Sequence, residues 1–143
     1  MAAPIPPKLR SLQAQLSEAG FDASQIASPE SFGNQTLLLE GPGLSIRAVC
    51  DRDDWSLELS VEAGGDHVWF LADIWRSCLE SGEPSIEPHS FEEDVAFVAT
   101  NLERLMRLTE SAEWDAFVDC LHSARQVRGE LMRRAIFGHG GDA

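Results

Sequence analysis

The sequence predicts an α+β domain, with an antiparallel β-meander of about four strands covered on one face by an N-terminal helix and a C-terminal helical pair. Alternating apolar and polar residues in the middle of the chain predict the strands, and apolar residues at helical spacing on either side predict the helices. The 143 residues are 43% hydrophobic, which is enough for one core. We therefore expect a single domain over residues 1–143, with flexible ends at 1–6 and 139–143.

The first helix is expected from Pro7 to about Ala19. Its three leucines recur at spacings of three and four, prolines precede or open the first turn, and Gly20 is placed to end it. The segment from Phe21 to Gln35 contains a proline, a glycine, an asparagine and several serines. This composition predicts an irregular connection between the helix and the meander.

The strands are predicted from period-two patterns bounded by turn residues. In the clearest of them, Trp55, Leu57, Leu59 and Val61 share one face, and the polar residues between them share the other. Segments rich in glycine or aspartate separate the strands and supply the turns. The predicted strands are Thr36 to Glu40, Leu44 to Cys50, Trp55 to Glu62 and His67 to Phe70.

The rest of the chain is predicted to be helical, beginning with a short helix around Ala72 to Leu79. Ser90 followed by Glu93 matches a capping box, which predicts a longer helix starting near Phe91. Another helix follows a break at Thr109 to Ala112, and both of these helices carry an apolar stripe. We expect the two to pack as an antiparallel pair on the apolar face of the meander.

Acidic side chains are concentrated in one part of the chain. Thirteen carboxylates and only two basic residues lie between Asp51 and Asp94, so this stretch carries −11 of the chain's formal net charge of −13. Such a charge density repels itself and speeds the encounter with a basic partner. The acids that open helices are explained by capping and the helix dipole. The remaining positions are predicted to dock a protein partner with a basic surface: Asp51, Asp53, Asp54, Glu58, Glu62, Asp66, Glu80, Glu83 and Glu87.

A simpler interpretation of the same acids is that they are ordinary solvated charges on turns and on the polar side of strands. The aspartates of the turn at Asp51 to Asp54 could also hold a cation weakly, although the calcium-loop pattern is absent. An exposed aromatic residue such as Trp69 or Trp75 could anchor the partner, and either could instead belong to the core.

No motif in the sequence names a reaction. The four histidines and three cysteines form none of the paired spacings typical of metal sites, and the cysteines are expected to be reduced thiols. We expect a protein that is not an enzyme and that needs no cofactor or metal. The balance of 11 basic against 24 acidic residues disfavours direct binding to nucleic acid. No apolar run reaches the length of about 18 residues that spans a bilayer, and no leader is recognised, so we expect a cytoplasmic protein away from the membrane.

The one basic cluster lies near the C-terminus. It contains Arg125, Arg128, Arg133 and Arg134, opposed by Glu130. The cluster is most simply the solvated face of the last helix. It could also offset the acid elsewhere in the fold or in a second copy of the chain.

Three segments in a fixed order carry a resemblance to a known class of proteins. An aromatic strand end at Trp69 and Phe70 precedes a short helix with Trp75 in HVWFLADIWRSCLESGEPS, and SFEEDVAFVATNLERLMRL and AEWDAFVDCLHSARQVRGELMRR follow. Over about residues 36–135 this order resembles the small acidic immunity proteins of bacterial polymorphic toxin systems. The resemblance implies a protein without catalysis of its own that binds and neutralises one cognate toxin.

A second class of small acidic α+β proteins is also similar. Secretion chaperones begin with a helix before an antiparallel meander and act as dimers that hold an effector protein. The opening helix favours this class, and the long helical pair at the end of the chain is a departure from it. The oligomeric state of the present chain stays open.

Overall fold

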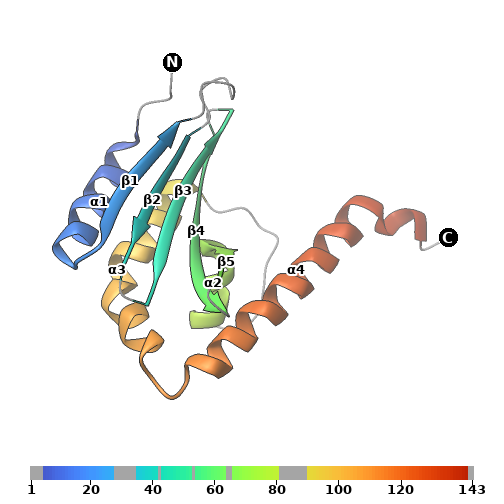
Figure 1. The fold of residues 1–143 in the computed structure, drawn as a ribbon. Helices are drawn as coiled ribbons and strands as arrows, with labels where there is room; N and C mark the ends of the chain where they lie inside the picture. Colours follow the sequence, from blue (N-terminus) through green and yellow to red (C-terminus); the bar gives the residue numbers. More distant parts are fainter. Residues whose placement is uncertain are drawn as a thin grey trace.

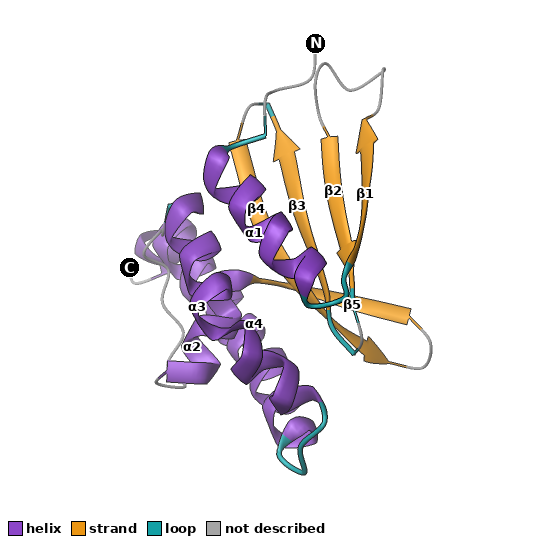
Figure 2. Cartoon of the chain, turned by 90° about the vertical axis from the view of Figure 1, so that its left-hand side faces the viewer, coloured by secondary structure: helices purple, strands orange, loops and turns teal. Residues whose placement is uncertain are grey.

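The structure is a computed structural model that describes residues 5–27, 35–41, 43–52, 54–63, 66–80 and 90–141. It has two layers, an antiparallel sheet and a layer of helices that lies on one side of the sheet (Figures 1 and 2). This arrangement confirms the α+β class. None of the helices in the described ranges combines the length and the apolar character needed to cross a bilayer.

The sheet is a meander in which each strand pairs with the next one along the chain, in the order β1-β2-β3-β4-β5. It has five strands, one more than predicted, because β1 forms within the stretch from Phe21 to Gln35 that was expected to be irregular. The other four strands lie where they were predicted. The strand bounds are β1 Asp22–Ala27, β2 Gln35–Glu40, β3 Ser45–Asp51, β4 Asp54–Ala63 and β5 Asp66–Leu71.

The four helices also begin near their predicted starts. Ser90 caps α3 through the predicted capping box, in which its hydroxyl accepts from the backbone N–H of Glu93 and the Glu93 carboxylate accepts from the N–H of Ser90. The last helix continues through Gly141, past the flexible end expected from His139. The helix bounds are α1 Pro7–Glu18, α2 Ala72–Glu80, α3 Phe91–Thr109 and α4 Trp114–Gly141.

The strand register sorts the residues of the sheet onto an inner face and an outer face. Leu39, Ile46, Leu59 and Phe70 lie in one row across the inner face, and each is at most 1% exposed. The helices cover this face. From α2 they add the fully buried Trp75, whose indole Nε1–H donates to the carbonyl oxygen of Leu59 at 3.1 Å.

The helices pack differently from the predicted pair. α1 and α3 lie side by side beneath the sheet, whereas α4 packs mainly against α2, and α3 and α4 diverge from their connection (Figure 1). An aromatic cluster explains why α4 packs against α2. The ring of Trp75 on α2 lies 6.1 Å from that of Trp114 and 5.5 Å from that of Phe117, both on α4. Both apolar stripes exist, but only the first part of α4 uses its stripe to join the core.

Candidate protein-docking surface

The outer face of the sheet has no covering helix among the residues that the structure describes, as Figure 2 shows. Its side chains follow from the register, because residues paired across the sheet share a face. One row contains Asp22, Glu40, Ser45, Ser60 and Trp69. The next row contains Ser24, Leu38, Arg47, Glu58 and Leu71.

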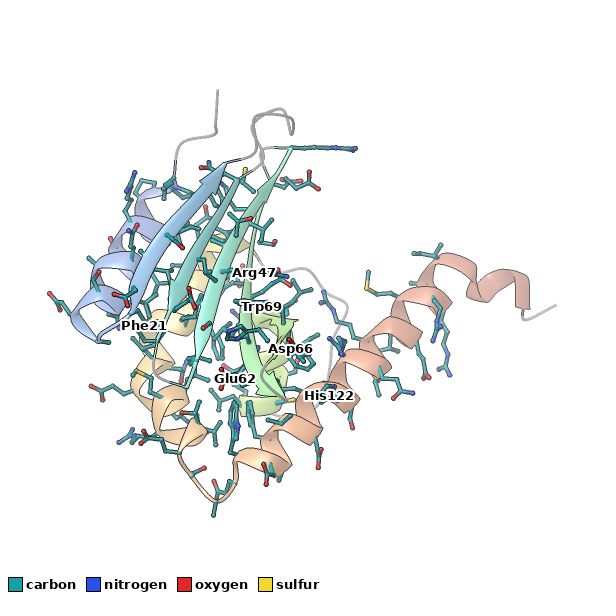
Figure 3. All side chains as sticks on the ribbon, viewed as in Figure 1. Phe21, Arg47, Glu62, Asp66, Trp69 and His122 are labelled. Atoms are coloured by element: carbon teal, nitrogen blue, oxygen red, sulfur yellow. The ribbon has the colours of Figure 1, made fainter. Side chains whose placement is uncertain are left out.

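An arginine and a tryptophan lie at the centre of the outer face (Figure 3). Arg47 is directly opposite Glu58, and its Nε–H donates to the Glu58 Oε1 atom at 2.8 Å. The same guanidinium lies 4.3 Å from the centroid of the Trp69 ring, within the range of a cation–π contact. Trp69 is half-buried because Arg47 lies over its ring and the neighbouring strand lies beside it.

A histidine extends this centre towards the β4–β5 hairpin. The His67 ring lies 5.8 Å from the Trp69 ring, and its Nδ1 atom is 3.1 Å from the hydroxyl oxygen of Ser60, which is 1% exposed. Leu38 and Val49 add half-buried apolar side chains to the same face. A compact centre with an aromatic ring, an arginine and apolar residues is typical of the core of a protein interface.

Three of the predicted acidic residues, Asp51, Asp54 and Glu62, lie at the two ends of the outer face. Asp51 and Asp54 are exposed and directly opposite each other where β3 meets β4. Glu62 is exposed at the other end of β4. Asp66 is also exposed, beside the hairpin to β5 (Figure 3), but it pairs with Ala63 and so lies on the same side of the sheet as Val68 and Phe70, not on the outer face. With a rise of about 3.3 Å per residue, β4 separates Asp54 from Glu62 by roughly 25 Å.

Glu58 and Glu80 differ from this exposed group. The Glu58 side chain is 18% exposed and its charge is balanced by Arg47, so it belongs to the centre of the face rather than to its acidic margin. Glu80 lies one residue past the predicted end of the short helix at Leu79, but it is the last residue of α2 and lies in the helical layer. Asp53, Glu83 and Glu87 lie outside the described residues.

Two further carboxylates lie on the outer face that the sequence interpretation missed. Asp22 of β1 and Glu40 of β2 are exposed and directly opposite each other. Asp22 was hidden because β1 was not predicted, and Glu40 because it ends an apolar run. The outer face thus has two pairs of like charges in register, a placement that destabilises a sheet. By register, the described residues of this face carry six carboxylates and one arginine, a net charge of −5.

The two tryptophans proposed as anchors lie in different parts of the fold. Trp75 is 0% exposed and belongs to the core, so it cannot contact a partner without unfolding. Trp69 lies on the outer face and can contact one.

The helical layer holds the cavities and the thiols. A cavity of about 480 Å³ opens between α2, α3 and α4, and Cys78, Arg104, Arg107 and Phe117 lie in its wall. Burial and the neighbouring Cys120 thiol raise the pKa of the Cys78 thiol from 9.0 to about 12, so Cys78 is protonated at neutral pH. Across the described ranges, no group of three or more histidine, cysteine or acidic side chains could hold a metal ion.

Comparison with known proteins adds no assignment: no protein family, curated protein or solved structure matches this chain.

Proposed function

We propose that this chain is a non-catalytic binding protein that docks the outer face of its sheet on a basic protein partner. The observation that carries the proposal is the composition of that face. Carboxylates that oppose each other across strands surround a centre made by Arg47 and Trp69. Like charges in register weaken the isolated sheet, so their presence is best explained by a partner that neutralises them.

The centre and the margin of the interface would have different roles in binding. Trp69, held under Arg47, offers a flat aromatic surface whose orientation is set before binding, which lowers the entropy lost on docking. The exposed acids would steer a basic partner and set the salt dependence of its association.

The partner that best fits this chemistry is a cognate bacterial toxin that the protein neutralises in the cytoplasm. If the toxin is a nuclease, the carboxylates would occupy the place of substrate phosphates and block the basic surface that binds them. The small acidic immunity proteins that the sequence resembles act by this general route, and the outer face would supply it here.

Association kinetics test the docking face. A variant in which Asp22, Glu40, Asp51 and Glu62 become amides should associate with the toxin at least about tenfold more slowly at low salt, with a weaker salt dependence. Replacing Glu103 and Glu110 by glutamine is the control, because these exposed acids lie on or beside α3, in the helical layer. The product of the neighbouring gene is the first protein to use as the partner. Equal association rates for both variants would refute docking through the outer face.

A secretion chaperone is the second candidate. The observation that favours it is α1, which precedes the meander and packs beneath it through its buried leucines, the order expected of that class. The partner distinguishes the two functions. A folded basic enzyme whose activity is blocked supports toxin neutralisation, and an unfolded effector segment held by a dimer supports the chaperone.

A further inference from the structure

The C-terminal part of α4, residues 129–141, leaves the body of the molecule, and we call it the arm. Just before the arm, Arg128 still contacts the body, because its Nη2 lies 3.6 Å from Oδ2 of Asp73 on α2. Beyond it, each side chain described up to Ile136 is exposed except the half-buried Leu131. Figure 1 shows the arm pointing away from the sheet and from the other helices.

The arm carries an uncovered apolar stripe. Leu131, Met132 and Ile136 lie on one side of the helix, the side that continues from the buried Leu121 and Ala124. Met132 is 45% exposed and Ile136 is 66% exposed, which makes them two of the most exposed large hydrophobic residues described. Helices in proteins gain most of their stability from packing such a stripe against another surface. We therefore expect another surface to cover the stripe of the arm.

The positive charge of the arm indicates that the surface covering it is acidic. The arm carries two arginines and one carboxylate, a net charge of +1, and residues 120–141 together carry +3, whereas residues 1–119 carry a net charge of −15. Arg125 and Arg128 are held by the body, Arg125 through the Trp69 carbonyl oxygen and the Phe70 ring. Arg133 and Arg134 are exposed on the arm, which points away from its own sheet.

We propose that the arm docks on the outer face of the sheet of a second copy of this chain. That face offers the matching chemistry, with half-buried apolar residues and Trp69 at its centre and carboxylates around them. Arms exchanged in both directions form a closed pair with two equivalent contacts. The inference does not depend on the proposed toxin, because it concerns the purified chain alone.

The size of the contact sets its strength. An arm of 13 residues is about 20 Å long and about 10 Å wide, so each contact covers on the order of 200 Å² of sheet. Two such contacts are smaller than a typical stable interface of about 800 Å² per partner. The pair is therefore weak and sensitive to salt, and a basic partner of higher affinity would displace the arm from the face.

Analytical ultracentrifugation of the full chain over a wide range of concentration tests the proposal. At low salt and high concentration the mass should approach twice 15.7 kDa, and high salt should return it towards 15.7 kDa. Replacing Met132 and Ile136 by glutamate, or Arg133 and Arg134 by glutamate, should weaken dimerisation by about tenfold or more. The control variant carries Ser123→Glu and Gln126→Glu, two exposed positions of α4 before the arm, and should dimerise nearly as the unchanged chain does.

A charge exchange identifies the docking face. A chain with Glu40→Arg and Glu62→Arg, two exposed acids of the outer face, should not dimerise alone, and neither should the chain with Arg133→Glu and Arg134→Glu. Mixing the two chains should restore a dimer, because each reversed arm then meets a reversed face. Circular dichroism and melting temperatures verify that every variant is folded.

Three results would overturn the proposal. The chain could remain at 15.7 kDa under all conditions, the arm variants could dimerise as the unchanged chain does, or the mixture could fail to restore the dimer. Binding of the arm to anionic lipid vesicles without dimerisation would count against it as well. Loss of dimerisation with unchanged toxin binding would leave the proposed function intact.

Discussion

Trp69 and Trp75 lie six residues apart in the chain and on opposite faces of the sheet. Strand β5 ends at Leu71 and α2 begins at once, so the chain turns from the sheet into the helical layer between them. Trp75 is fully buried and bonded to Leu59, whereas Trp69 stays on the outer face beneath Arg47. One of these residues therefore stabilises the fold, and the other is available for binding.

Replacing each tryptophan by phenylalanine separates these roles. Trp75→Phe should lower the free energy of unfolding by about 2 kcal/mol, because it removes ring volume from the core and the bond to Leu59. Trp69→Phe should change it by less than about 1 kcal/mol, since only a surface contact with Arg47 weakens. Urea denaturation measures both. Equal losses would contradict the assignment of Trp69 to the outer face.

The Cys78 thiol makes stability depend on pH in the alkaline range. The folded chain keeps this proton up to about pH 12, while the unfolded chain loses it near pH 9, so the unfolded state binds fewer protons in between. The free energy of unfolding should therefore be unaffected by this group below pH 9 and should fall as pH rises from 9 towards 12. The chain is suited to the measurement because it has no tyrosine and Lys8 is its sole lysine.

Two variants test whether the Cys78 thiol causes this pH dependence of stability. Cys78→Ala should flatten the alkaline slope of stability, measured by urea denaturation at several pH values. Cys120→Ala should leave a smaller slope, because burial is the larger cause of the shift and persists without the second thiol. A slope unchanged by Cys78→Ala would assign it to other groups.

The sequence alone predicts the exposure of some residues, but it does not predict which residues meet in the fold. The exposure of Asp51, Asp54 and Glu62 followed from turn and strand patterns alone. The pairing of Arg47 with Glu58 depends on the register between β3 and β4, and the meeting of Cys78 with Cys120 depends on the packing of α4 against α2. Neither relation leaves a local signal in the sequence.

At the scale of elements, α3 is the clearest case of local control. Ser90 and Glu93 satisfy each other's backbone donors, and three acidic residues lie in the first turn. Ser90→Ala should lower the free energy of unfolding by about 1 kcal/mol, because a backbone N–H of the first turn loses its acceptor. Thermal melting measures the change. Ser123→Ala is the control, since Ser123 is exposed within α4 and should have little effect.

Strand β1 shows where local patterns fail. Its sequence DASQIA contains one β-branched residue and several small ones, which gives it little preference for a strand. It is placed by its surroundings instead. Buried Phe21 packs so closely on Gly41 that any side chain there would collide with its ring, and this contact holds the start of β1 beside the end of β2. Tertiary packing of this kind cannot be inferred from composition.

The packing of the helices could not be predicted from the sequence either. The stripes of α3 and α4 were predicted correctly, but a stripe does not specify which surface will cover it. The Trp75, Trp114 and Phe117 cluster makes α2 the partner of α4, and the arm keeps its stripe exposed. Element identity was therefore predictable, and element pairing was not.

At the scale of the whole molecule, charge and stability oppose each other. The variant with amides at Asp22, Glu40, Asp51 and Glu62 should be more stable than the unchanged chain by several tenths of a kcal/mol, because it removes like-charge pairs from the sheet. Melting temperatures at low salt measure the gain, with the Glu103 and Glu110 amide variant for comparison. Added salt should shrink the difference. A loss of stability would show that these acids support the fold.

The placement of the four tryptophans provides an optical reporter of the outer face of the sheet. With no tyrosine in the chain, ultraviolet emission comes almost entirely from tryptophan, and Trp55, Trp75 and Trp114 belong to the inner side or the helical layer. Only Trp69 emits from the outer face. A quencher dissolved in the solvent should therefore reach the buried Trp75 least readily. A partner seated on the outer face should shield Trp69 and leave the half-buried Trp55 and Trp114 as accessible as before, without any added label.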